Sequence, residues 1–415
     1  MARRPSPKLT RPKSTRSATG LTPSKNLSQP CSEARMDADL ALYIHWPFCV
    51  SKCPYCDFNS HVRESVDVAA WQAALLADLA YEAGAAPRRP LTSIFFGGGT
   101  PSLMPPALVG MLIETAEQLW GFASDIEITL EANPSSVEAE RFADLAAAGV
   151  NRVSLGLQAF DDATLHLLGR AHDGAEGLAA LAVAQQHFAR VNFDLIYALP
   201  GQSLEAWEAD LMRAVSLGTT HLSLYQLTIE PGTRFETLVR TGDLTPKDPD
   251  EAAAFYERTH DLTAAAGLPR YEISNHAAPG AESQHNLTYW RYGDYMGIGP
   301  GAHGRRQGIA TLRHRKPENF LNAITRNGHG AQSEEPLSSA EQAREALLMG
   351  LRLESGINLA QIATKTGQPE DQLVNRAAIA ALSQHGLIAQ TGTRLRVLPE
   401  GMLLLDRILA EIVAA

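Results

Sequence analysis

The amino-acid sequence predicts an α/β fold, in which a partial, six-stranded TIM-like barrel of the (β/α)6 type precedes a mostly helical, winged-helix-like C-terminal domain. The first observation behind this prediction is that six apolar runs, rich in β-branched and aromatic residues, alternate with Ala-rich segments of helical periodicity. Such alternation indicates a parallel sheet with helical crossovers. The second observation is that the alternation stops near residue 270, after which helices and a short hairpin are expected.

Each apolar run ends in a polar or glycine-rich turn, which marks the carboxyl end of a strand. The expected strands are 42–47, 93–100, 126–134, 152–160, 191–200 and 221–229. The expected helices between them include 67–83, 105–120 and 137–148. A complete barrel has eight strands, so six strands form an incomplete one, and functional residues in such folds lie at the carboxyl ends of the strands.

Four parts of the chain differ in composition: a basic leader (1–36), the barrel (37–270), a connecting segment rich in His, Tyr, Trp and Gly (271–335), and the C-terminal domain (336–415). In the last part we expect helices over 338–353, 359–366 and 369–385, strands over 387–390 and 394–397, and a final helix over 400–413. Winged helices often bind DNA, but this one has no basic stripe. We therefore interpret it as a packing or partner module.

The overall composition suits a globular protein with two domains and argues against nucleic-acid binding. Of the 415 residues, 45% are hydrophobic and 20% are charged, and the net charge is -10. Binding to nucleic-acid phosphates needs a basic face, which this balance does not favour. We find no apolar run near the roughly 18 residues of a membrane span and no apolar core of a secretory signal. The expected location is the cytoplasm, and the protein is not expected to be transmembrane.

The leader is expected to be disordered, because it is rich in Ser, Thr and Pro and poor in apolar residues. Residues 1–35 hold eight Lys or Arg residues and one acid. An Arg-rich, acid-poor leader superficially suits an organelle transit peptide, but no amphipathic apolar face is evident. We favour either a flexible tail or a true start at Met36. Cys31 lies in the leader and is not expected to be a ligand.

Three of the four cysteines, Cys49, Cys53 and Cys56, follow the first expected strand in the spacing C-x3-C-x2-C. Thiols this close suit a metal or cluster site in a reducing compartment better than a disulfide framework. Three thiolates leave one iron of a four-iron cluster open, whereas a structural zinc site needs four ligands. The alternative is therefore a zinc site completed by His45 or His61.

This spacing, in this place, resembles the radical S-adenosylmethionine (SAM) superfamily. The resemblance implies that the three cysteines bind a [4Fe–4S] cluster and that SAM chelates the fourth iron. One electron then cleaves the sulfonium and yields a deoxyadenosyl radical. It also implies that Tyr55 packs against the adenine and that Gly98, Gly99 and Thr100, in FFGGGTPS, contact the methionine moiety. The alternative for the glycines is a tight strand-to-helix turn, since the G-K-[ST] of a phosphate loop is absent.

Three polar residues interrupt apolar runs near strand ends: Glu131, Gln158 and Asp194. A buried carboxylate or amide is unfavourable unless it has a partner. Structural pairing inside the barrel explains each residue by itself about as well as a functional role does. Because all three should face the same end of the barrel, together they favour a binding site.

Further strings narrow the resemblance to the HemN family of oxygen-independent coproporphyrinogen III dehydrogenases and the related HemW family of heme chaperones. These strings are YIHWPFC (43–49), GLQAFDDATLHLLGRAH (156–172) and FDLIYALPGQ (193–202). The similarity runs from about residue 42 through the C-terminal domain. It implies that the first SAM molecule is contacted by Tyr43, Tyr55, Gly98, Gly99, Thr100 and Glu131. It implies a second SAM molecule at Gln158, Arg170 and Asp194.

Two departures separate the families. The dehydrogenases have a further cysteine two positions after the third, where this chain has Phe58, and an N-terminal segment that helps to hold substrate. The string HNLTYW (285–290) fits the H-N-x-x-Y-W motif of HemW-type proteins. Imidazole is a common axial ligand of heme, so His285 is the candidate heme ligand, with Tyr289 and Trp290 lining the site. The alternative is a histidine held by the fold beside packed aromatics, and His303 is a weaker candidate.

The first hypothesis is thus a heme chaperone that binds a [4Fe–4S] cluster, SAM and heme and passes heme to hemoproteins, plausibly in the respiratory chain. Relatives imply a homodimer and no required radical catalysis, so no catalytic residue is assigned. The second hypothesis is an enzyme of porphyrin biosynthesis that oxidatively decarboxylates coproporphyrinogen III. The third is a zinc-stabilised binding scaffold.

Overall fold

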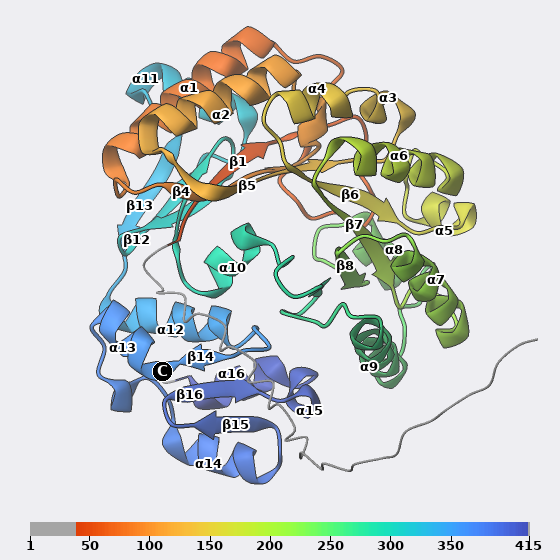
Figure 1. Cartoon of the computed structure of the whole chain (residues 1–415), viewed down its shortest axis with the longest axis vertical. Helices are drawn as coiled ribbons and strands as arrows, with labels where there is room; N and C mark the ends of the chain where they lie inside the picture. The colour runs from red at the N-terminus through yellow and green to blue at the C-terminus, as the bar shows by residue number, and fades with distance from the viewer. Residues whose placement is uncertain (1–38, 414–415) are drawn as a thin grey trace, which may run out of the picture. The chain divides into compact units, whose positions relative to one another are not determined.

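The computed structural model describes residues 39–413 and shows a curved sheet with helices on its outer face, followed by a separate small helical domain (Figure 1). The basic leader, Cys31 and Met36 lie outside the described residues. No helix within residues 39–413 is long and apolar enough to cross a membrane.

Six parallel strands form the middle of an eleven-stranded sheet, in chain order. They are β1 (Leu40–Trp46), β4 (Leu91–Gly98), β5 (Phe122–Ala132), β6 (Arg152–Gln158), β7 (Arg190–Tyr197) and β8 (His221–Gln226). All five pairings between them are parallel. The predicted six-stranded partial barrel is confirmed. Each strand alternates side chains between the inner and outer faces, so polar residues two apart point to the same inner space.

The crossover helices cover the outer face of these strands (Figure 1). They are α1 (Val68–Ala85), α2 (Pro106–Trp120), α5 (Asp162–Leu167), α6 (Gly174–His187) and α7 (Leu204–Ser216). Burial of Trp71, Leu75 and Leu79 on one side of α1 shows why that segment is helical, since these residues recur at helical spacing.

The single helix expected over 137–148 is wrong in detail, because the chain forms two short helices there, α3 (Ser136–Ala139) and α4 (Phe142–Ala147). The Glu138 carboxylate is buried and accepts hydrogen bonds from the Asn133 N–H (2.8 Å) and from the Ser102 hydroxyl. Arg141 donates to the Ser102 carbonyl (3.2 Å). These tertiary bonds override the helical propensity of the segment.

The segment 271–335 adds strands to both edges of the sheet. Strand β9 (Asn275–Ala277) pairs antiparallel with β8, and β10 (Asp294–Ile298) pairs parallel with β1. Strands β11 (His303–Arg306), β12 (Ile309–Arg313) and β13 (Ala331–Pro336) then continue the sheet antiparallel. These five strands were not predicted. Two helices belong to the same segment: α10 (Gln284–Trp290) and α11 (Pro317–Asn327).

A buried ion-pair network ties this extension to α1. Arg313 pairs with Asp78 (3.1 Å) and with Glu82 (2.5 Å), and all three side chains are fully buried. Arg306 adds a second bond to Glu82 (2.9 Å). Buried charges of this kind are stable only when paired, so the network fixes the extension against the first crossover helix.

Two further helices, α8 (Arg234–Thr241) and α9 (Pro249–Ala265), connect β8 to β9. The C-terminal domain has its own apolar core and the predicted order of helices and hairpin. Its helices are α12 (Ser339–Gly350), α13 (Leu359–Thr366), α14 (Arg376–Gln384), α15 (Pro399–Met402) and α16 (Leu405–Ile412). Its three-stranded sheet contains β14 (Ile357–Asn358), β16 (Arg394–Val397) and β15 (Ile388–Thr391).

Two helix predictions in this domain need correction. The helix expected from residue 369 begins only at Arg376, because the Asn375 side chain accepts the N–H groups of the first turn and so caps it there. The last helix is divided into α15 and α16, with Leu404 between them in a non-helical conformation.

Candidate functional site

The three neighbouring cysteines lie on the loop that follows β1. Cys49 ends the short strand β2 (Phe48–Cys49), which pairs in parallel with β3 (His61–Val62), and Cys53 and Cys56 lie between these strands. All three thiols are free and partly buried. Burial raises the pKa of the Cys49 and Cys56 thiols. Among residues 39–413, no group of three or more His, Cys, Asp or Glu side chains is gathered to hold a metal ion as it stands.

The glycine-rich segment at the end of β4 packs directly against this cysteine loop. The Gly99 N–H donates to the Trp46 carbonyl (2.7 Å), and the Thr100 N–H donates to the Phe48 carbonyl (2.9 Å). Thr100 Oγ1 lies 3.5 Å from Cys49 Sγ. A Cβ on Gly99 would lie 2.7 Å from the Phe48 carbonyl oxygen, so the close approach of the two segments requires glycine.

Gly98 turns the same backbone toward the inside of the barrel. Its φ of +118° lies in the region that favours glycine. A Cβ here would lie 2.7 Å from the His45 imidazole. The Gly98 N–H donates to Glu131 Oε2 (3.2 Å), so the predicted glycine segment and the first predicted carboxylate are brought together.

Arg170 brings a positive charge to the cysteine loop. Its Nη1 lies 3.5 Å from Cys53 Sγ, and its Nη2 donates to Asn133 Oδ1 (2.6 Å) and to the Gly156 carbonyl (3.0 Å). The Arg170 Nε atom is buried and has no hydrogen-bond partner in the described part of the chain. The charge of Arg170 also lowers the pKa of the Cys49 thiol, although burial raises that pKa by more.

The two predicted carboxylates at strand ends face each other across the inner space. Burial, and then the charge of Asp194, raises the pKa of Glu131 to about 8. Burial also raises the pKa of Asp194 to about 6, although Ser154 Oγ (3.2 Å) and Asn192 Nδ2 (3.0 Å) donate to it. Perturbed carboxylates in a shared space are typical of functional sites.

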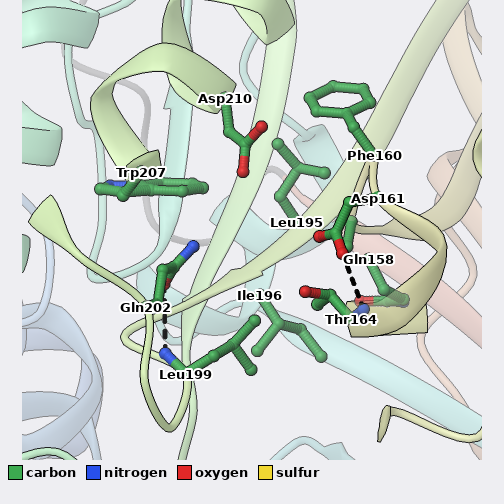
Figure 2. A pocket seen from close by; sticks show the side chains of 11 residues that line it. Gln158, Phe160, Asp161, Thr164, Leu195, Ile196, Leu199, Gln202, Trp207 and Asp210 are labelled. Carbon is green, nitrogen blue, oxygen red and sulfur yellow. Dashed lines mark hydrogen bonds between the residues drawn. The ribbon is translucent and has the colours of Figure 1, made fainter. Parts of the chain in front are cut away.

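Gln158 lines a small pocket (Figure 2). Its φ is +68°, which is unusual for a residue with a side chain. A Cβ on Gly156 would lie 2.8 Å from Gln158 Nε2 and 3.3 Å from Arg170 Nη2, so the two side chains meet over this glycine. The pocket itself is lined by Phe160, Asp161, Thr164, Leu195, Ile196, Leu199, Gln202, Trp207 and Asp210, among others.

The two predicted tyrosines flank the site from different sides. Tyr43, on β1, stacks on Phe95 with ring centroids 6.2 Å apart, and its hydroxyl lies 2.9 Å from His45 Nδ1. Tyr55, on the cysteine loop, packs against Phe235 (6.2 Å) and hydrogen-bonds Arg170. The predicted SAM-contacting residues therefore surround one end of the barrel.

His285 lies further toward the amino ends of the strands. It is 1% exposed, and its Nδ1 lies 3.0 Å from the hydroxyl of Ser93, which is near the start of β4. Ser93 precedes Gly98 by five residues, or roughly 17 Å along the strand. His285 Nε2 lies 2.6 Å from the Tyr289 hydroxyl, so both ring nitrogens are engaged. Burial lowers the pKa of His285 to about 3.

Helix α10, which carries His285, lies on the inner side of the sheet, away from the outer helices (Figure 1). Tyr289 and Trp290 are partly buried on the same helix, and His303 is exposed at the start of β11. Heme ligation at His285 stays a prediction, and it would require one of the two hydrogen bonds, to Ser93 or to Tyr289, to open.

The residues at the carboxyl end fit the cluster that the resemblance implies. Three free thiols supply three ligands, and the buried, unpartnered Nε of Arg170 offers a donor beside them. The zinc alternative fits less well: His45 Nδ1 and Nε2 are both hydrogen-bonded, to the Tyr43 hydroxyl and the Asn59 carbonyl. The Nε2 atom of His61 has no hydrogen-bond partner among the described residues, but His61 forms no metal-binding group with the cysteines.

Two asparagines of the site were not predicted. Asn133 follows directly after β5, and its side chain accepts a hydrogen bond from Arg170. A polar residue directly after a strand, as in EANP, could have identified it as a site residue. The backbone carbonyl of Asn59 accepts a hydrogen bond from His45 Nε2. The Asn59 side-chain amide donates to the Pro300 carbonyl (2.9 Å). No sequence pattern marks Asn59, since its partners lie far away in the chain.

Comparisons with known proteins agree with this geometry. The chain matches the family model of the radical SAM superfamily over residues 43–214 and that of the HemN C-terminal domain over 337–404. The radical S-adenosyl methionine domain-containing protein 1, mitochondrial, of Bos taurus is 38% identical over 94% of this chain and 91% of its own. The heme chaperone HemW of Escherichia coli is 39% identical over 89% of this chain and 97% of its own.

Among solved structures, the coproporphyrinogen III oxidase (HemN) of Escherichia coli superposes with a TM-score of 0.77 at 22% identity, over 91% of both chains. At that identity the likeness shows a common fold. Fold, cysteine loop and family match define a protein of the radical SAM superfamily. Within this superfamily the chain belongs to the HemW family, whose curated bacterial members are named heme chaperones.

Proposed function

We propose that this protein is a heme chaperone that carries a [4Fe–4S] cluster on Cys49, Cys53 and Cys56, binds SAM beside it, and delivers bound heme to hemoprotein acceptors. The observation that carries the proposal is the donor set of the cysteine loop: three free thiols, with Phe58 where a dehydrogenase has its further cysteine. Phe58 is 60% exposed, so it fills no structural role in the core.

The cluster and SAM, when bound, supply one-electron cleavage of the sulfonium. The role of the surrounding side chains is to bind the cluster and SAM and to orient them. Arg170 offers its unpartnered Nε as a donor to an anionic group of the ligand. Glu131, with a pKa of about 8, holds a proton over much of the neutral range and accepts the Gly98 N–H.

The contacts of Gln158 and Arg170 over Gly156 support a second ligand position on the same side of the inner space as Asp194. We assign a second SAM molecule to this position. The acceptors are proposed to be hemoproteins of the respiratory chain, and the working form a homodimer. We place the protein in the cytoplasm, and relatives named mitochondrial make cell fractionation the direct check.

The decisive experiment is anaerobic purification and cluster reconstitution, followed by heme titration read from the Soret absorbance. The same sample is assayed for turnover of coproporphyrinogen III. Stoichiometric heme binding without turnover is expected. Formation of protoporphyrinogen at enzymatic rates would replace the chaperone by a dehydrogenase that works without a cysteine at Phe58. Zinc without iron or sulfide in the reconstituted protein would contradict both.

A further inference from the structure

We propose that His285 is a positioning residue for the SAM side of the barrel: its imidazole supports Phe95 and Tyr43 and, through His45, the cysteine loop, and it is not the iron ligand of heme. This inference rests on the proposed function, because contact of Tyr43 with SAM is part of that function. It assigns the H-N-x-x-Y-W segment to the cofactor site, although the segment lies at the other end of the barrel.

The imidazole has no free nitrogen for iron. Nδ1 lies 3.0 Å from Ser93 Oγ, and Nε2 lies 2.6 Å from the Tyr289 hydroxyl. The side chain is 1% exposed, and burial holds it in the neutral form, with one nitrogen as donor and the other as acceptor. An axial ligand needs an accessible lone pair, which this arrangement uses for hydrogen bonding.

The backbone of the histidine is fixed as firmly as its ring. The His285 N–H donates to Glu127 Oε1 (3.1 Å), and Ser283 Oγ donates to the same oxygen (3.2 Å). Glu127 is itself held by Arg190 (3.6 Å) and Arg152 (3.9 Å). The start of α10 is therefore pinned to β5, and the position of the imidazole is set by the barrel wall.

From this fixed point, stacked rings lead toward the cysteine loop. The His285 ring stacks on Phe95 (centroids 5.0 Å apart, planes at 27°), and Phe95 stacks on Tyr43 (6.2 Å, 25°). The Tyr43 ring is also 6.4 Å from the His285 ring. The three rings form one packed unit, in which the imidazole is the member held by hydrogen bonds at both nitrogens.

Hydrogen bonds continue the connection beyond Tyr43. His45 Nε2 lies 2.9 Å from the Asn59 carbonyl, which only accepts, so Nε2 carries the proton and Nδ1 accepts from the Tyr43 hydroxyl (2.9 Å). Asn59 comes three residues after Cys56 on the cysteine loop. The Asn59 carbonyl thus sets the tautomer of His45, and the Tyr43 hydroxyl donates to the nitrogen that remains.

The backbone of β4 blocks Tyr43 on one side, so the ring can move only toward the side that the imidazole occupies. A Cβ at Gly97 would lie 2.9 Å from Tyr43 Cε2 and 3.1 Å from its hydroxyl oxygen, so the ring lies flat on the backbone of β4. With β4 on one side and Phe95 beside it, loss of the imidazole leaves a gap into which Phe95 and Tyr43 can tilt. That tilt breaks the Tyr43–His45 bond and loosens the cysteine loop.

The test compares wild type, His285→Ala, His285→Gln and Tyr43→Phe after anaerobic cluster reconstitution. SAM is titrated against the reduced cluster and followed by electron paramagnetic resonance, and heme is titrated and followed by its Soret band. Gln keeps a flat amide with an NH2 group that donates and a carbonyl oxygen that accepts, but an amide is a poor ligand for heme iron. Positioning therefore predicts rescue by Gln, and ligation does not.

In His285→Ala, SAM binding should weaken roughly five- to tenfold, about the effect of losing one neutral hydrogen bond. Tyr43→Phe should weaken it similarly, His285→Gln should stay within about twofold of wild type, and all variants should keep the wild-type Soret position. If both His285 variants lost that Soret position while SAM binding was unchanged, His285 would be the heme ligand and the proposal would be wrong. Unchanged SAM binding in Tyr43→Phe would overturn it as well.

Thermal melting by circular dichroism checks that the variants fold. If His285→Ala does not fold, His285→Gln and Tyr43→Phe decide between the two roles, because each keeps the buried volume nearly constant. A wild-type protein that takes up iron but binds no SAM would overturn the proposed function itself, before any variant is compared.

Discussion

The two ends of the barrel differ in how their polar groups are satisfied. At the carboxyl end, Cys49, Cys53 and Cys56 are free thiols, the Nε of Arg170 has no partner among the described residues, and Glu131 has a raised pKa. At the amino end, His285 has a hydrogen-bond partner at each ring nitrogen, and Glu127 accepts bonds from α10 while it faces two arginines.

This difference indicates that the carboxyl end is arranged to bind a ligand, whereas the polar groups of the amino end stabilise the fold. Buried polar groups in a stable core are paired, and those left without partners mark places where something else binds. Two motifs, C-x3-C-x2-C and H-N-x-x-Y-W, look equally functional in the sequence. In the structure they differ in whether their polar groups are available to a ligand. The first presents free thiols, whereas in the second His285 and Tyr289 are hydrogen-bonded to each other and the Trp290 Nε1 atom has no partner among the described residues.

The largest expected effect is at the carboxyl end, from Cys53→Ala. Loss of one of three ligands should reduce reconstituted iron and sulfide to background, because the remaining thiols cannot hold a four-iron cluster. The thermal midpoint without cluster should stay close to that of wild type, since Cys53 is on a loop and only partly buried. Iron analysis and circular dichroism measure the two quantities.

Cys31→Ala is the matched control for that variant and should retain full iron content. Global unfolding of Cys53→Ala would instead indicate a structural metal site, and the comparison between the two ends would then fail.

The next effect is at the amino end, from Glu127→Ala. Arg152 and the start of α10 would lose a buried carboxylate, so the free energy of unfolding should fall by about 3 kcal/mol. Urea denaturation measures this loss. Iron content per folded molecule should not change, because the three cysteine ligands themselves are retained. The control, Glu208→Gln, breaks an exposed pair with Arg258 and should leave the urea midpoint nearly unchanged.

A smaller effect is expected from Gly98→Ala. The added Cβ would lie 2.7 Å from the His45 imidazole at a φ of +118°, which should destabilise the protein by roughly 1–3 kcal/mol. Cluster retention during gel filtration should fall too, since the same backbone packs on the cysteine loop. Gly84→Ala is the control: it lies in α1, meets no atom within 4 Å, and should be neutral or slightly stabilising. Equal stability of both variants would count against a special role for Gly98.

The last prediction concerns the pH dependence of stability, and its variant is Glu131→Gln. Glu131 has an ordinary pKa of 4.5 and a folded-state pKa of about 8, so between these values the folded protein binds more protons than the unfolded chain. The free energy of unfolding should therefore fall as pH rises from about 4.5 to about 8. Urea titrations across this window should show a shallower fall in the variant. Parallel curves for both proteins would show that Glu131 titrates normally.

The central strands could be predicted because they are continuous apolar runs, as expected for strands covered on both faces. Strand β6, RVSLGLQ, is buried over all but its last residue. Strand β13, AQSEEP, is mostly exposed and polar, and it is a strand only because β12 offers it a hydrogen-bonding edge. The edge strands were missed for this reason.

The candidate site divides in the same way. Spacing along one loop was enough to select the cysteines, and the strand ends were enough to select Glu131 and Asp194. Asn59 was missed because its role depends on hydrogen bonds to His45 and to Pro300. Pro300 lies 241 positions away in the sequence.

What the sequence determined by itself is the order of the six central strands, the three thiols after the first of them and the glycines that follow the second. These features are local, since periodicity, chain turns and ligand spacing act over a few residues. Only the tertiary structure decided that His285 is enclosed, that Arg170 reaches the cysteine loop, and that two carboxylates share one space. Those outcomes depend on burial and on contacts between distant segments, which are properties of the packed chain.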